Sequence, residues 1–216
     1  ARYGNRMSSV FDLHGLGSPS LPRRSFAIDF FNASARISGG GRDGDDPPGS
    51  MPLDWLVAGR VGTLKPLLTT FAPSAGTPSY SDAYLRVGGG DPSALRVTGN
   101  LLIARDEFRI VDEDSHEQGD LEGRSRYLWL RFDREWSPTL QASLWVGQTR
   151  IESARTGTAS EPLIALGSVE DRRNSQLTDV RTRVDWQLHP RHLLQAGFEL
   201  TDERGHYTYT SDVLFP

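Results

Sequence analysis

The sequence predicts an all-β chain, on three observations. Apolar and polar side chains alternate with a period of two in many segments, and this is the period of a β-strand. The 22 glycines and 13 prolines interrupt the chain too often for long helices. The longest apolar runs, such as Trp55 to Ala58, have only four residues. A membrane-spanning helix needs about 20 apolar residues and the apolar region of a signal peptide about 7 to 15, so neither is expected.

Composition excludes several function classes. The chain has 216 residues and no cysteine, which excludes disulfides, thiolate metal sites and a cysteine nucleophile. Its 24 basic residues are outnumbered by 28 acidic ones, and no segment concentrates lysine and arginine. Nucleic acid is therefore not an expected partner.

The strands are predicted in order by the alternation. The clearest segment runs from Thr178 to Leu188, where Val180, Val184 and Trp186 occupy even positions and charged residues occupy most odd ones. Weaker alternation predicts strands in 25–38 and 55–61. The other predicted strands are 82–87, 95–103, 128–136, 140–147 and 194–201.

The predicted connections alternate between short and long. Short turns are expected at 88–92, 137–139 and 189–192, and long polar loops at 106–122 and 153–176. This sorting is typical of an up-and-down transmembrane β-barrel, which has short turns on one rim and long loops on the other.

Two further features favour the barrel. Strands of about 9 to 11 residues are long enough to cross a bilayer at a tilt. Trp136 and Trp186 lie just before short turns, where an aromatic girdle would meet the lipid headgroups. A water-soluble β-sandwich shares the alternation and is the alternative fold. Greek-key connections give a sandwich no reason to sort its loops in this way.

The N-terminal segment resembles a known family. Arg2-Tyr3-Gly4-Asn5-Arg6 and the Ser8-Ser9-Val10 run after it are similar to the last plug strand of TonB-dependent outer-membrane receptors. In that family this strand directly precedes the barrel. The segments that follow look like the early barrel of the same family, in the same order: 25–38, 54–60, 131–133 and 189–192.

The resemblance implies a fold and a function. Residues 1–20 would end the plug domain, and residues 21–216 would form the N-terminal part of the barrel. About nine strands of an antiparallel up-and-down transmembrane β-barrel of about 22 strands would be present. The chain starts without Met and ends on an apolar segment, which agrees with an internal piece of such a protein.

Such a protein would work at the cell outer membrane. It would bind a scarce nutrient, such as a siderophore, metal complex, vitamin or glycan, and take it up with energy supplied by TonB. Its partners would be the lipid bilayer, the TonB complex of the inner membrane and the nutrient. The alternative function is a secreted or periplasmic carbohydrate-binding β-sandwich.

One stretch departs from the expected pattern. Residues 39–53, rich in glycine, aspartate and proline, would fall on the rim of short turns. Either this turn carries an insertion, or the number of strands between residues 25 and 54 is off by one.

No enzyme chemistry is predicted. The five histidines are scattered, no nucleophile elbow is present, and no cofactor motif occurs. The acidic stretch 112–120 lacks the spacing of an EF-hand and is interpreted as a solvated loop rather than a metal site. Catalytic, cofactor and metal residues are therefore not assigned.

The remaining candidates are charged residues on the polar sides of two strands. They would face the barrel lumen, either lining a ligand route or, as we favour, pairing with each other or with the plug. They are Arg131, Asp133, Asp179, Arg181, Arg183 and Asp185.

Overall fold

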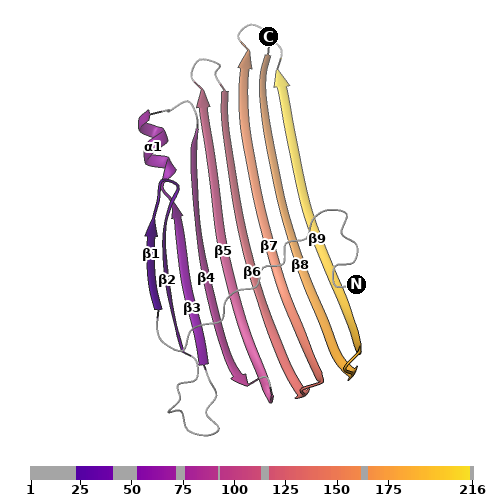
Figure 1. The fold of residues 1–216 in the computed structure, drawn as a ribbon. Helices are drawn as coiled ribbons and strands as arrows, with labels where there is room; N and C mark the ends of the chain where they lie inside the picture. The colour runs from indigo at the N-terminus through magenta and orange to yellow at the C-terminus, as the bar shows by residue number, and fades with distance from the viewer. Residues whose placement is uncertain are drawn as a thin grey trace.

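A computed structural model describes residues 23–40, 53–71, 76–91, 93–112, 117–161 and 165–214. These residues form one nine-stranded antiparallel sheet whose strands lie side by side in sequence order (Figure 1). The predicted all-β class and up-and-down order are confirmed. The sheet formed by these residues is open: it does not close into a barrel.

The strands lengthen along the chain. Their bounds are β1 (Arg23–Ile28), β2 (Asn32–Gly40), β3 (Leu53–Gly62), β4 (Thr77–Asp91), β5 (Leu95–Asp112), β6 (Glu117–Ser137), β7 (Leu140–Glu161), β8 (Ala165–His189) and β9 (His192–Leu214). A short helix, α1 (Leu64–Phe71), lies between β3 and β4. The alternation did not predict it, because eight residues at helical spacing are hard to recognise between strands. Among the residues that the structure describes, no helix has both the length and the apolar character needed to cross a membrane.

The predicted long loops are wrong. Most of 106–122 and 153–176 belongs to β5 to β8, which have 18 to 25 residues each. Apolar alternation covers only part of each of these strands. The strands continue beyond it because backbone hydrogen bonds to both neighbours extend the ladder where neither face is apolar. The predicted strand length of about 9 to 11 residues therefore describes only the apolar part of each strand. Similarly, the predicted turn at 88–92 is mostly strand, since β4 extends to Asp91.

The single strand predicted over 25–38 is also wrong. The structure places two strands there, β1 and β2, joined by a tight turn. Asp29 makes this turn because its Oδ1 accepts hydrogen bonds from the backbone N–H groups of Phe31 (2.8 Å) and Asn32 (2.9 Å). β2 still ends, and β3 still begins, at the rim that carries the turns before β5, β7 and β9 (Figure 1). Gly40 and Leu53, the described ends of this connection, therefore lie at the rim of short turns, and residues 41–52 lie outside the described residues.

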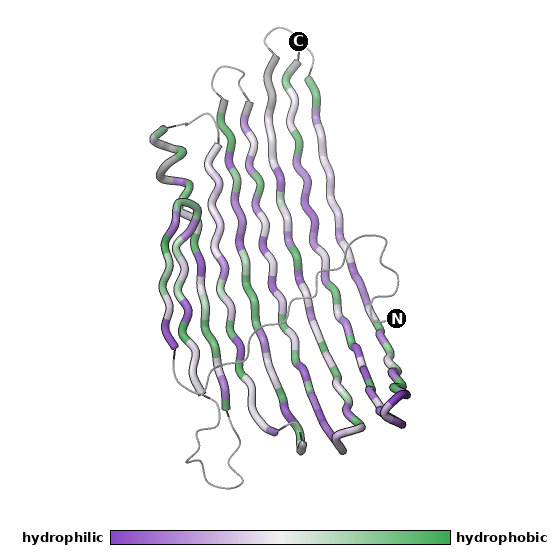
Figure 2. Tube along the Cα trace, in the orientation of Figure 1, coloured by the Kyte–Doolittle hydropathy of each residue, from purple (hydrophilic) through white to green (hydrophobic). Residues whose placement is uncertain are grey.

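Strand register gives the sheet one apolar and one polar face. Leu130, Val146, Val180 and Leu200 lie opposite one another on β6 to β9 and define what we term the apolar face. Their chain neighbours Arg131, Trp145, Arg181 and Glu199 are aligned in the same way on the opposite side, termed the polar face. Figure 2 shows the resulting alternation of hydrophobic and hydrophilic residues along each strand.

The two faces differ in exposure. Large apolar side chains project from the apolar face into the open, as Leu200 does with 59% of its surface exposed. The buried polar side chains all lie on the polar face: Ser38, Asp54, Thr98, Asn100 and Asp171. The described residues place no second layer over them, so this burial comes from crowding between neighbouring side chains. Polar groups thus bury one another, while apolar groups have no partner layer.

Candidate functional site

The six candidate residues all lie on the polar face of β6 and β8. They form three ion pairs, each within one strand: Arg131 Nε lies 2.8 Å from Asp133 Oδ2, Arg181 Nε 3.2 Å from Asp179 Oδ2, and Arg183 Nε 2.8 Å from Asp185 Oδ2. Residues two apart on a strand share a face, so the sequence places these charges next to each other. The structure thus shows these charges paired with each other, while their position in a lumen and any contact with a plug stay predictions.

Neighbouring strands extend each pair. Ser143 on β7 donates a hydrogen bond to Asp133 (2.8 Å), and Gln195 on β9 donates one to Asp185 (2.8 Å). Glu199 on β9 lies 3.2 Å from Arg181. These contacts therefore join β6 to β7 and, separately, β8 to β9 on the polar face.

A second cluster was missed by the sequence reading. Asp54 on β3 is only 4% exposed and forms ion pairs with Arg86 on β4 (3.4 Å) and with Arg96 on β5. Gly88 lies directly opposite Asp54 on β4 and leaves room for the carboxylate, since a Cβ there would be 2.9 Å from Asp54 Oδ2. This cluster depends on the register of three strands, which the alternation alone does not give.

Aromatic side chains lie between the two charged regions. Tyr84 on β4 stacks on Trp129 on β6, with ring centroids 6.1 Å apart, and its hydroxyl donates to Asn100 Oδ1 (2.7 Å). Arg131 lies over the Trp145 ring at 4.9 Å from its centroid, a cation–π geometry. The polar face thus presents paired charges together with aromatic rings, a surface suited to contact a polar solute or another polar protein surface.

Metal-binding geometry is absent from the part of the chain that the structure describes, which holds no group of three or more acidic or histidine side chains placed to share an ion. In the acidic stretch 112–120, residues 113–116 lie outside the described residues. Asp120 forms an ion pair with Arg109 at 2.5 Å instead. His189 and His192 lie with their rings 5.6 Å apart at the β8–β9 turn.

The space beside Asp179 gives a testable prediction. A Cβ added at Gly147 would lie 2.5 Å from Asp179 Oδ1, so Gly147→Ala should displace this carboxylate from Arg181 and lower the free energy of unfolding by about 1 kcal/mol. Urea unfolding of the refolded protein measures the change. Gly119→Ala is the control, because a Cβ there meets nothing within 4 Å. Equal effects at both positions would contradict this prediction.

Residues 1–20, predicted as the end of a plug domain, lie outside the described residues. Comparison with family models, with curated proteins and with solved structures found no match. A functional assignment therefore depends on the sheet itself and on the resemblance in the sequence.

Proposed function

We propose that this chain forms part of the wall of a TonB-dependent outer-membrane receptor, with its apolar face against lipid and its polar face toward an enclosed lumen. The protein would bind a scarce nutrient and take it up with energy from the TonB complex, without catalysis and without a cofactor. We use the term apolar band for the stretch of apolar side chains on the apolar face between the rim of short turns and the first charged residues. The observation that carries the membrane part of this proposal is the direction in which this band crosses the sheet. The nutrient and TonB parts rest on the resemblance of the N-terminal segment.

The rim of short turns runs obliquely across the strands. The register pairs Arg96 on β5 with Asp133, Asp133 with Ser143 on β7, Ser143 with Arg183, and Arg183 with Gly197 on β9. These paired residues form one row across the sheet, perpendicular to the strands, and this row serves as the reference level. β5 begins one residue before this level, β7 three residues before it and β9 five residues before it. The rim therefore shifts by one residue per strand. With a rise of about 3.3 Å per residue and a strand spacing of about 4.8 Å, the strands tilt by about 35° from the normal to the rim.

The far edge of the apolar band shifts by the same amount. On β5 the last apolar residue of this face before the charged region is Ile103, which is level with Arg204 on β9. On β9 the last such residue is Leu200, four residues before Arg204, so the shift over four strands is again one residue per strand. The band is thus parallel to the rim and oblique to the strands. A flat lipid layer around tilted strands requires this arrangement, and the tilt of about 35° is that of barrel strands.

The height of the band also fits a bilayer. On β8 it extends from Val180 to Leu188, about nine residues, which at a tilt of about 35° span about 24 Å, close to the apolar band of about 25 Å around outer-membrane barrels. Trp136 and Trp186 project from the apolar face near the short-turn edge, with 55% and 44% of their surfaces exposed. Amphipathic rings are favoured at this depth.

The alternative, a carbohydrate-binding β-sandwich, has less support. It would cover the apolar face with a second sheet, and the described residues instead follow one another in a single layer without a crossover. Strands of up to 25 residues also exceed those of soluble sandwiches, which average about five or six. A barrel wall accounts for both features.

Tryptophan depth provides the test. Two variants of the full chain would each keep one tryptophan, Trp186 on the apolar face or Trp145 on the polar face, with the other four changed to phenylalanine. In vesicles whose acyl chains carry bromine close to the headgroup, we expect strong quenching of Trp186 fluorescence and little quenching of Trp145. Quenching of neither tryptophan would reject the membrane assignment, and quenching of Trp145 alone would mean that the faces are reversed.

A further inference from the structure

Arginines gather on the apolar face beyond the band, on the side away from the short turns, from two to four residues past the last apolar side chain of each strand. The first row of aligned residues there contains Arg126, Arg150, Gln176 and Arg204, on β6 to β9. The next row contains Arg105, Arg124, Glu152, Asn174 and His206, on β5 to β9. We use the term arginine belt for the arginines of these two rows: Arg105, Arg124, Arg126, Arg150 and Arg204.

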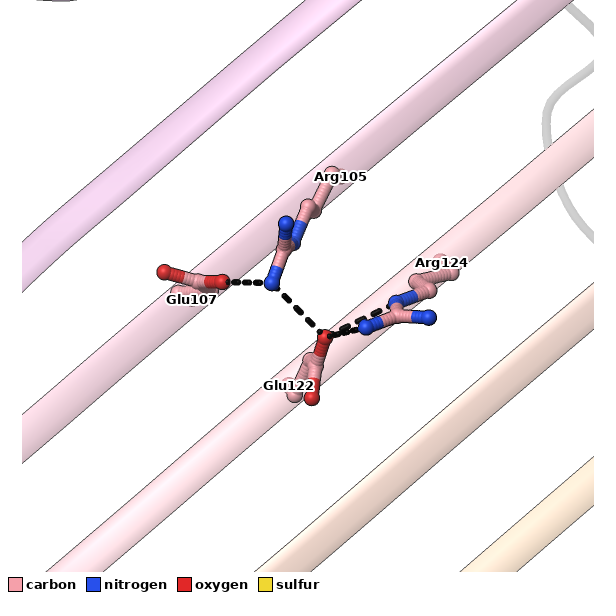
Figure 3. A network of polar contacts seen from close by, with 4 residues as sticks. All are labelled: Arg105, Glu107, Glu122 and Arg124. Carbon is pink, nitrogen blue, oxygen red and sulfur yellow. Dashed lines mark hydrogen bonds and ion pairs between the residues drawn. The ribbon is translucent and has the colours of Figure 1, made fainter.

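Carboxylates lie mainly on the far side of the belt. Glu107 and Glu122 occupy the third row from the band, and both form ion pairs with Arg105 (Figure 3). Arg124 donates to Glu122 as well, from Nε at 2.8 Å. This hydrogen bond lowers the pKa of the Glu122 carboxyl below its usual value, which favours its charged form. The acids paired with Arg105, Arg124 and Arg150 therefore lie on the side remote from the band, whereas Asp202, the partner of Arg204, lies on the band side.

The belt retains capacity for further anions. Arg105 and Arg124 keep about half of their side-chain surface exposed, at 51% and 48%. Arg126 is exposed and forms no ion pair with any other residue that the structure describes. Arg150 and Arg204 have one carboxylate each, Glu152 and Asp202. A guanidinium has five N–H donors, so single carboxylates leave donors unused.

The opposite edge of the band differs. There, Arg134 lies over the Trp136 ring, 5.3 Å from its centroid, and Trp186, Leu188 and Leu194 share the edge. The rows of arginine belong to one side of the band. A membrane-spanning wall of this kind would meet different headgroup chemistry in its two leaflets.

We propose that the arginine belt binds the phosphate groups of anionic lipid headgroups in the leaflet on the side away from the short turns, an inference that rests on the proposed membrane function. Headgroup phosphates lie directly outside the hydrocarbon layer, which is where the belt meets the end of the apolar band. The planar guanidinium fork matches phosphate oxygens in two-pronged hydrogen bonds, which lysine does not offer.

The test compares lipid selectivity in vesicles. The full chain would be folded into vesicles of phosphatidylcholine mixed with phosphatidylglycerol, and the association of spin-labelled phosphatidylglycerol relative to phosphatidylcholine would be measured by electron spin resonance. We expect a preference for phosphatidylglycerol that falls by roughly fivefold per arginine removed at the affected sites in a triple variant, Arg124→Gln with Arg126→Gln and Arg150→Gln. A control variant removes two arginines of the same face that lie farther from the band, Arg109→Gln with Arg172→Gln, and should keep the preference.

The outcomes separate the two proposals. Tryptophan quenching by brominated acyl chains, recorded on the same samples, reports whether the protein inserts. Insertion with equal selectivity in the triple variant and the unchanged chain would overturn the belt and leave the membrane function standing. Failure of the unchanged chain to insert would reject the membrane function and the belt with it. If added inorganic phosphate removes the preference while sulfate at equal ionic strength does not, the belt is a site for free phosphate, and the lipid assignment is wrong.

Discussion

Val184→Arg should lower the free energy of unfolding of the membrane-inserted protein by about 2 to 4 kcal/mol, the cost of arginine at the bilayer midplane of a barrel. Val184 lies in the middle of the apolar band on β8, between Ala142 and Ala196 on the adjacent strands. It has 38% of its surface exposed, and its neighbours are small, so under the proposed membrane function the new side chain would project into lipid rather than into protein. Urea titration of the protein in phosphatidylcholine vesicles, followed by tryptophan fluorescence, measures the loss.

The control adds the same charge on the other face. Gln195 lies opposite Asp185 on the polar face, one residue along β9 from Ala196, the partner of Val184. Gln195→Arg places a guanidinium next to that carboxylate and should change stability by less than about 1 kcal/mol. If Gln195→Arg proved the more harmful substitution, the two faces would be assigned the wrong way round.

Asp54→Leu should cost about 3 kcal/mol, near the lower end of the range for removing one partner of a buried ion pair. Asp54 separates the guanidinium groups of Arg86 and Arg96, which are themselves largely covered. Without the carboxylate, two like charges would face each other across β4 and β5 in a crowded region. The urea midpoint of the refolded protein reports this effect whether or not the sheet lies in a membrane.

An exposed pair provides the comparison for Asp54. Asp202 forms an ion pair with Arg204 at 3.1 Å, but both side chains are well exposed. Asp202→Leu should therefore cost less than about 1 kcal/mol, because water and salt screen an exposed pair. Similar costs for Asp54→Leu and Asp202→Leu would show that the Asp54 cluster contributes no more than a surface pair.

The sequence predicted the parts of the fold that depend on one strand at a time. The alternation from Thr178 to Leu188 identified the faces of β8, and the same parity made Arg183 and Asp185 neighbours. It did not predict that β8 begins at Ala165, because the strand continues where both faces are polar. Backbone hydrogen bonds to the adjacent strands stabilise that extension, and they leave no pattern in the sequence of a single strand.

Side-chain contacts between several strands could not be predicted from the alternation within one strand. Asp54 meets Arg86 and Arg96 only because of the register between β3, β4 and β5. Register depends on turn geometry and on irregularities such as the shift between Glu135 and Ser137 on β6. Alternation within single strands therefore placed charged residues on one side of each strand, while the buried cluster could be found only from the pairing of neighbouring strands.

Most ion pairs among the described residues join an arginine to an acid two positions away on the same strand, as in Arg131 with Asp133 and Arg150 with Glu152. Such a segment carries its own counter-charge before any neighbour arrives. During assembly, each hairpin would therefore join the sheet with most of its arginines already paired to acids of the same strand. Because these ion pairs form within a strand, few unpaired charges would be present while hairpins are added one after another, and the electrostatic energy of the partly assembled sheet would stay low.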